Sequence, residues 1–68
     1  MVNTQALKDL IAERGLKMSH ISRTTGINRT SLWQKINGMT EFKSSEIVKM
    51  CDVLGIKTKR ETDAIFFN

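Results

Sequence analysis

The sequence predicts a small all-α domain. The chain of 68 residues has no proline and four glycines, and leucine, isoleucine, methionine, lysine and glutamate recur along it, a composition that favours helix over sheet. Apolar residues three and four positions apart recur between the glycines, as on the buried face of an amphipathic helix. Because a chain of this length buries only about 60% of its unfolded surface, we expect residues 1–68 to form one domain.

The first two helices are predicted near residues 4–14 and 18–25. Thr4 is the expected N-cap of the first, and Gly15 supplies the left-handed residue that ends it. Gly26 is expected to end the second in the same way. One face of the first helix carries apolar residues at helical spacing: Leu7, Leu10 and Ile11.

The third helix is predicted over residues 29–36, with Asn28 as its N-cap and an Asn-Gly pair at its end. Leu32 and Ile36 lie one turn apart and are expected to face the core. Another side of this helix carries a different set of residues: Arg29, Trp33 and Asn37. One face is therefore predicted to be buried while the other is free to bind a partner.

Ser44 or a neighbouring residue is expected to cap a fourth helix that ends before Gly55, which places its start to within a residue or two. Its inner face comprises Ile47, Met50, Cys51 and Leu54. Thr58 and Glu61 have capping-box spacing, which predicts a last short helix. That helix carries an apolar cluster at its end: Ile65, Phe66 and Phe67. The cluster either folds back over the first and fourth helices or forms the contact with a second copy of the chain.

Basic charge is concentrated in one third of the chain. The net charge is +4, and residues 14–40 contain no aspartate or glutamate. The basic residues of this segment are Arg14, Lys17, Arg23, Arg29 and Lys35. Such an uninterrupted positive segment predicts binding of a polyanion, the alternative being an ordinary solvated surface.

The composition argues against several other classes of protein. With Cys51 as the single cysteine and His20 as the single histidine, one chain can form neither an internal disulfide nor a zinc site of four protein ligands, so we expect no metal and no cofactor. No stretch approaches the ~20 apolar residues of a membrane span, and the first residues do not resemble a signal peptide. We therefore expect a cytoplasmic protein. The expected binding face has no acid and no second histidine, which argues against an enzyme.

Two short helices joined by a tight glycine turn outline a helix-turn-helix unit. From Leu7 to Ile56 the chain resembles the Cro and lambda-repressor-like, or XRE-like, family of DNA-binding domains. The features that carry the resemblance are Ile21, Gly26, Ile27, Leu32, Ile36, Asn37-Gly38 and Leu54-Gly55-Ile56. The resemblance implies a four- to five-helix domain with its helix-turn-helix motif at about residues 18–37.

The resemblance also implies which residues contact double-stranded DNA. The base-reading positions are Arg29, Thr30, Trp33 and Gln34, with Asn28 and Asn37 at the margins. Three further residues are better placed to bind phosphates: Ser19, Lys35 and Lys43. Arg29 can donate two hydrogen bonds to guanine, Gln34 can pair with adenine, and Thr30 or Trp33 can pack on a thymine methyl group. Trp33 could instead cap the core beside Leu32.

The sequence departs from the family pattern at Ser22 and Met18. Ser22 replaces the alanine that the family prefers, and its hydroxyl is expected to bond back to the helix backbone. Met18 stands where many members carry a glutamine that anchors the second helix on a phosphate. Backbone N–H groups at that helix start could still hold the phosphate.

These features predict a phage-type, Cro-like transcriptional repressor that binds its operator as a homodimer through the C-terminal cluster. The alternative is a small antirepressor that docks on a partner phage repressor through Trp33 or the same cluster. RNA binding is less favoured, because the pattern offers neither a sheet with stacking aromatic residues nor a glycine-rich clamp loop.

Overall fold

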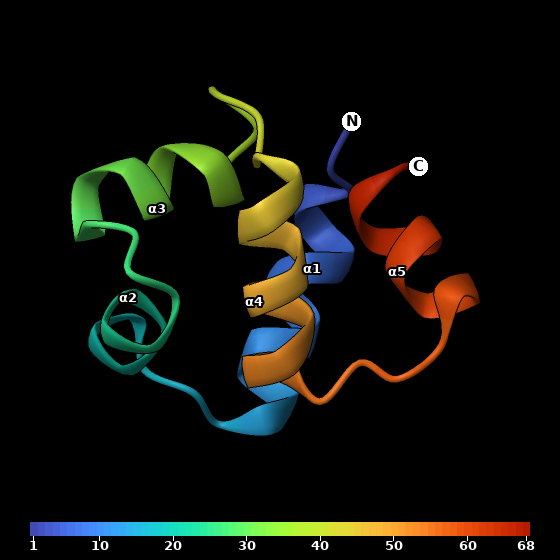
Figure 1. Ribbon diagram of the computed structural model, residues 1–68, viewed down its shortest axis with the longest axis horizontal. Coiled ribbons are helices and arrows are strands. Elements are labelled where there is room, and N and C mark those ends of the chain that lie inside the picture. The colour runs from blue at the N-terminus through green and yellow to red at the C-terminus, as the bar shows by residue number, and fades with distance from the viewer.

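Five helices follow one another along the chain, and there is no strand. The computed structural model describes all 68 residues, and the helices are α1 (Thr4–Arg14), α2 (Met18–Thr25), α3 (Arg29–Ile36), α4 (Ser44–Leu54) and α5 (Lys59–Phe66). In Figure 1, α2 and α3 lie on one side of α4 and α5 lies on the other. None of the helices is long and apolar enough to cross a membrane. The all-α fold predicted from the sequence is confirmed.

The start of α1 corrects one prediction. Asn3, rather than Thr4, is the N-cap, because its side-chain oxygen accepts a hydrogen bond from the amide of Ala6 at 3.1 Å. Asn3 has an extended backbone, whereas Thr4 already belongs to the helix. Asparagine and threonine both cap helices well, so neighbouring candidates cannot be separated by residue type alone.

The caps of α3 and α5 agree with the sequence pattern. Asn28 accepts a hydrogen bond from the amide of Ser31 at 2.8 Å, and Thr58 accepts one from the amide of Glu61 at 3.2 Å. Each bond satisfies an N–H group that has no partner inside the helix. Both helices therefore begin where their capping residues place them.

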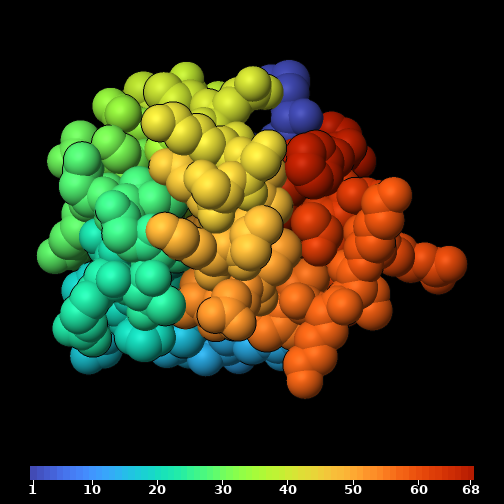
Figure 2. All heavy atoms as spheres, in the orientation of Figure 1, coloured from blue at the N-terminus to red at the C-terminus, as the bar shows by residue number.

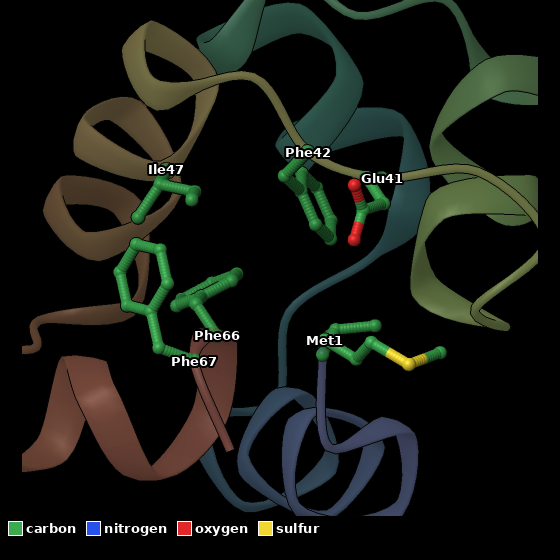
Figure 3. A pocket seen from close by; sticks show the side chains of 7 residues that line it. Met1, Glu41, Phe42, Ile47, Phe66 and Phe67 are labelled. Carbon is green, nitrogen blue, oxygen red and sulfur yellow. The ribbon is translucent and has the colours of Figure 1, made fainter.

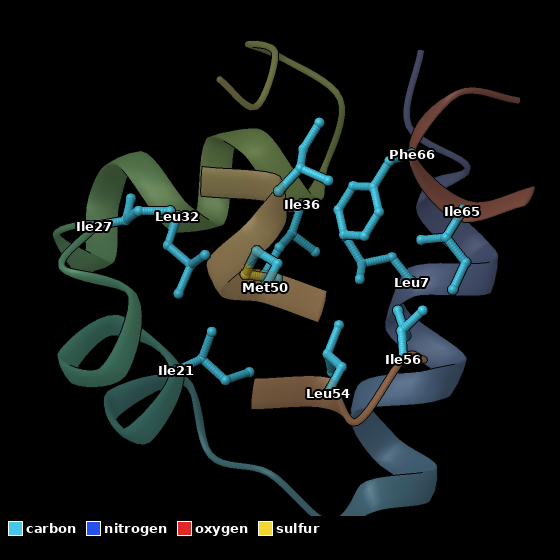
Figure 4. Close-up of a cluster of buried hydrophobic side chains, with 11 residues drawn as sticks. Leu7, Ile21, Ile27, Leu32, Ile36, Met50, Leu54, Ile56, Ile65 and Phe66 are labelled. Atoms are coloured by element: carbon cyan, nitrogen blue, oxygen red, sulfur yellow. The ribbon is translucent and has the colours of Figure 1, made fainter. Parts of the chain in front are cut away.

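The core is built from 11 buried apolar side chains contributed by every helix and by two connections: Leu7, Ile21, Ile27, Leu32, Ile36, Ile47, Met50, Leu54, Ile56, Ile65 and Phe66. Figure 4 shows them converging from α1, α3, α4 and α5. Leu32 and Ile36 point inward as predicted. The opposite side of α3 therefore faces outward.

The turn between α2 and α3 is held by side chains as well as by its glycine. Gly26 has φ +77°, a left-handed conformation that is strained for other residues. The buried Thr25 hydroxyl donates to the carbonyl of Ile21 at 2.7 Å. Ser22 donates to the carbonyl of Ile27 in the turn, not to its own helix backbone as expected, because the turn brings that carbonyl over the end of α2.

The C-terminal helix packs onto the rest of the molecule. The amide of Asn3 donates to the carbonyl of Ile65 at 2.6 Å, and Ile65 and Phe66 are buried in the core. On the α4 side, the Cys51 sulfur lies 3.4 Å from the Thr62 hydroxyl oxygen. Of the two alternatives for the C-terminal cluster, Ile65 and Phe66 therefore follow the first, because they fold back into the core of the same chain.

Phe67 differs from its two neighbours because it is 59% exposed. It stands at a shallow hollow of about 120 Å³ whose other lining residues are Met1, Val2, Glu41, Phe42, Ile47 and Phe66. Figure 3 shows its ring next to Ile47. Phe67 is thus the one member of the C-terminal cluster that a second copy could reach.

Candidate nucleic-acid interface

The outer face of α3, formed by Arg29, Thr30 and Trp33, is open to solvent. All three side chains are exposed, and Trp33 is 55% exposed. The alternative that Trp33 caps the core beside Leu32 therefore does not hold. A helix can enter the major groove of DNA only with such a face free, since the groove is about 12 Å wide.

A hollow of about 320 Å³ lies at the junction of this face with the start of α2. Its lining residues are Met18, Arg29, Thr30 and Trp33. Met18 is half-buried and packs against the core at the same time. Met18 was not among the residues predicted to contact DNA, because it departs from the family pattern. Its place in the motif, at the first residue of α2, was the signal that could have included it in the site.

Of the other predicted base-reading residues, Asn28 and Asn37 lie at the two ends of α3 and Gln34 lies within it. Asn28 uses its side-chain oxygen to cap the helix. Asn37 donates from its side-chain amide to the carbonyl of Trp33 at 2.8 Å. Gln34 is half-buried. Each of these side chains therefore has less freedom to contact a base than the exposed outer face.

Lys35, a predicted phosphate-binding residue, makes its contacts within the protein. Its ammonium nitrogen lies 3.1 Å from a carboxylate oxygen of Glu46 and donates to the carbonyl of Glu41 at 3.0 Å. Only 12% of the side chain is exposed. Lys35 therefore ties the end of α3 to the start of α4 and is not a free cation on the surface. Sequence spacing could not reveal this, because Glu46 belongs to another helix.

Glu46 has a perturbed acidity because of this contact. Partial burial raises the pKa of the carboxyl. Hydrogen bonds from the Lys43 backbone amide and the Lys35 ammonium group lower the pKa, and so do the positive charges of the two lysine side chains. The net pKa lies below its usual value. The amide of Lys43 donates to the carboxylate at 2.8 Å, so Glu46 holds both the start of α4 and the end of α3.

Two helices begin at a lysine that offers no acceptor to the first-turn amides. Lys17 is the N-cap of α2, which has no side-chain cap bond, and Lys43, whose backbone amide is satisfied by the Glu46 carboxylate, is the N-cap of α4. Asn28 and Thr58, in contrast, cap α3 and α5 with oxygen atoms. At the start of α2, a cation beside uncapped N–H groups is the arrangement that attracts an anion. Ser19, in the first turn of α2, is exposed.

The basic residues of the segment 14–40 divide into two groups. Arg14 donates to the carbonyl of Leu54 at 3.0 Å, and Lys35 is paired with Glu46. The remaining three are exposed on α2, at its start or on α3 and have no ion-pair partner: Lys17, Arg23 and Arg29. Lys17, which directly precedes the lining residue Met18, thus joins the candidate site.

The comparisons with known proteins agree with this geometry. Residues 6–59 match the sequence profile of the Cro/C1-type HTH DNA-binding domain. The matched segment includes nearly all of α1 and all of α2, α3 and α4, and it stops at the first residue of α5. No curated protein and no solved structure matches the chain.

Proposed function

Because the chain belongs to the Cro/C1-type helix-turn-helix DNA-binding domains, we propose that it is a phage-type transcriptional repressor that reads an operator through the major groove. Its family was identified correctly from the sequence. The observation that carries the proposal is the exposed outer face of α3, with Arg29 at the start of the helix and no acidic residue in the surrounding segment. A face of this kind suits both the groove and the charge of DNA.

Base recognition is assigned chiefly to the outer face of α3. The Arg29 guanidinium group can donate a bidentate pair of hydrogen bonds to O6 and N7 of guanine. Thr30 can donate a hydrogen bond or place its methyl group against thymine. Gln34 is assigned a contact with adenine, while Asn28 and Asn37 serve at the two ends of the helix.

Phosphate binding is assigned to the uncapped start of α2 and to the Lys43 side chain at the start of α4. Lys17 and Ser19 supply a cation and a hydroxyl at the start of α2, and Lys43 supplies a cation at the start of α4. Backbone N–H groups at a helix start add a partial positive charge that favours a phosphate. These contacts orient the domain on DNA without reading its sequence.

We further propose that the repressor acts as a homodimer. The longest extent of one chain is 26 Å, whereas successive half-sites on one side of DNA lie about 34 Å apart. One copy therefore reaches a single half-site. Figure 2 shows the residues of α5 at the edge of the molecule opposite those of α2 and α3, so a contact through exposed Phe67 leaves the DNA-binding side free.

The proposal is tested by an electrophoretic mobility shift with DNA from around the gene of this chain, at several salt concentrations. Retarded bands that weaken steeply with salt support the operator-binding function. Binding to a co-expressed phage repressor, with no shift of any DNA, would instead establish the antirepressor alternative. Arg60 is exposed on α5, so Arg60→Ala is the matched control for substitutions at Arg29.

A further inference from the structure

The hollow beside α3 combines two apolar side chains with an open mouth. Met18 forms part of its wall from α2, and Trp33 forms part from α3, with Arg29 and Thr30 completing the lining. Met18 is anchored because it also packs against the core, whereas the indole of Trp33 is 55% exposed. The hollow therefore has a supported wall and an accessible apolar side.

The hollow is large enough to admit a group that projects from the edge of a base. It measures about 320 Å³, whereas a water molecule in the liquid occupies about 30 Å³, so there is room for a methyl group and part of the ring that carries it. Among the unmodified base edges in the major groove, only thymine presents an apolar group, its C5-methyl. Apolar walls favour that edge over the polar edges of the other bases.

The charge around the hollow indicates DNA as the source of the methyl group. Arg29 contributes to the lining itself, and exposed Lys17 directly precedes Met18 at the start of α2. No acidic residue occurs in the segment 14–40. An anionic partner that carries a small apolar group can pack on the apolar walls and is attracted by the basic residues.

We propose that this hollow receives the C5-methyl group of one thymine in each half-site, and that Met18 is a specificity-determining residue. This inference rests on the proposed DNA-binding function and adds a residue of α2 to the base-reading set. Burial of a single methyl group corresponds to about a fourfold change in Kd. The interaction therefore discriminates thymine from the same base without its methyl group.

The experiment starts by selecting tight-binding duplexes from a random pool with the full chain. Each thymine of one half-site in the selected duplex is then replaced singly by deoxyuridine, which removes only the methyl group, and Kd is measured by fluorescence anisotropy. We expect about a fourfold weakening at one thymine and little change at the others. In Met18→Gln the Kd values for thymine and deoxyuridine at that position should become equal.

Two further variants make the result independent of the folding of Met18→Gln. Trp33→Ala alters an exposed side chain and should also abolish the difference between thymine and deoxyuridine. Met39→Gln is the matched control, because Met39 is 63% exposed in the connection after α3 and lies outside the hollow. The control should retain the fourfold difference.

Other outcomes would overturn the inference in distinguishable ways. If no duplex is selected, the proposed function fails and the inference fails with it. If duplexes are selected but no thymine is sensitive to loss of its methyl group, only the inference fails. An unchanged difference in Met18→Gln and Trp33→Ala would likewise refute the assignment of the hollow while leaving DNA binding intact.

Discussion

Among single residues, Arg29 is expected to contribute most to recognition of DNA sequence. It is exposed at the start of α3 and has no ion-pair partner, so its guanidinium group is free for guanine. We predict that Arg29→Ala weakens specific binding by roughly 1–3 kcal/mol and relaxes preference at one base pair. Binding titrations against single-base variants of the selected duplex would measure both effects.

Arg60→Ala removes the same type of side chain from α5 and should leave Kd nearly unchanged at moderate salt. If both arginine variants lost affinity equally and retained the same base preference, Arg29 would be a phosphate contact or a distant charge. The base-reading assignment at this residue would then be wrong.

The contact between Lys35 and Glu46 makes stability depend on pH. Since the pKa of Glu46 is lower in the folded chain, the carboxylate stabilises the fold at neutral pH, and this contribution is lost as the pH falls through the folded pKa. We predict that Glu46→Gln costs roughly 1–3 kcal/mol at neutral pH. Denaturant titrations at decreasing pH, down to about pH 3, should show the difference between parent and variant shrinking.

A difference that stays constant through the acid range would show that the carboxylate charge is not responsible. The same contact shows a limit of sequence reading at the residue scale. Lys35 looks like a free cation on α3, and only the packing of α3 against the start of α4 brings it to Glu46. Exposure of Arg29 and Trp33, in contrast, follows from the helical position of Leu32 and Ile36.

At the scale of elements, the boundaries of the helices were largely predictable because local chemistry determines them. Gly15, Gly26 and Gly55 end helices in the left-handed conformation, and Asn28 and Thr58 begin them. The start of α4 could be placed only to within a residue or two. Its N-cap, Lys43, has no side-chain oxygen to accept a hydrogen bond, and Glu46 accepts from the Lys43 amide instead, so Ser44 is the more obvious cap in the sequence although it already belongs to the helix.

The orientation of α3 is tested through its buried side. Leu32 and Ile36 are 0% and 4% exposed, so we predict that truncation of either to alanine costs about 2–5 kcal/mol. That loss approaches the whole stability of a domain of this size. Circular dichroism during thermal unfolding should show largely unfolded variants at temperatures where the parent is folded.

Val48→Ala is the control for these truncations, because Val48 is 69% exposed on α4 and should change stability little. If Leu32→Ala unfolded at the same temperature as the parent, its side chain would not be in the core, and α3 would have to be turned differently about its axis. The outer face assigned to DNA would then be wrong as well.

At the scale of the whole molecule, a contact between two copies should control affinity. We predict that Phe67→Ala keeps the fold, since the ring is 59% exposed, but weakens dimerisation. If each subunit neutralises about three phosphates, the slope of log affinity against log salt is about −5 for a dimer and about half that for a monomer. Sedimentation and salt titrations of parent and variant would measure both quantities.

A dimer of unchanged stability in Phe67→Ala would exclude Phe67 from the contact. The sequence left this point open because the cluster of Ile65, Phe66 and Phe67 is equally apolar throughout. Only the position of α5 against α1 separates the two core residues from the exposed one. Partner contacts of this kind depend on the assembled surface, which no local pattern encodes.

Because Cys51 contacts Thr62 of α5, the reactivity of its thiol reports whether α5 is packed against α4. Cys51 is the single cysteine of the chain, and its sulfur is half-buried against α5. A thiol reagent will therefore modify it faster whenever α5 detaches. The ratio of this rate to that of an unprotected cysteine reports local opening of the last helix. Loosening of α5 can thus be timed separately from global unfolding and from release of DNA, without adding any label to the DNA-binding side.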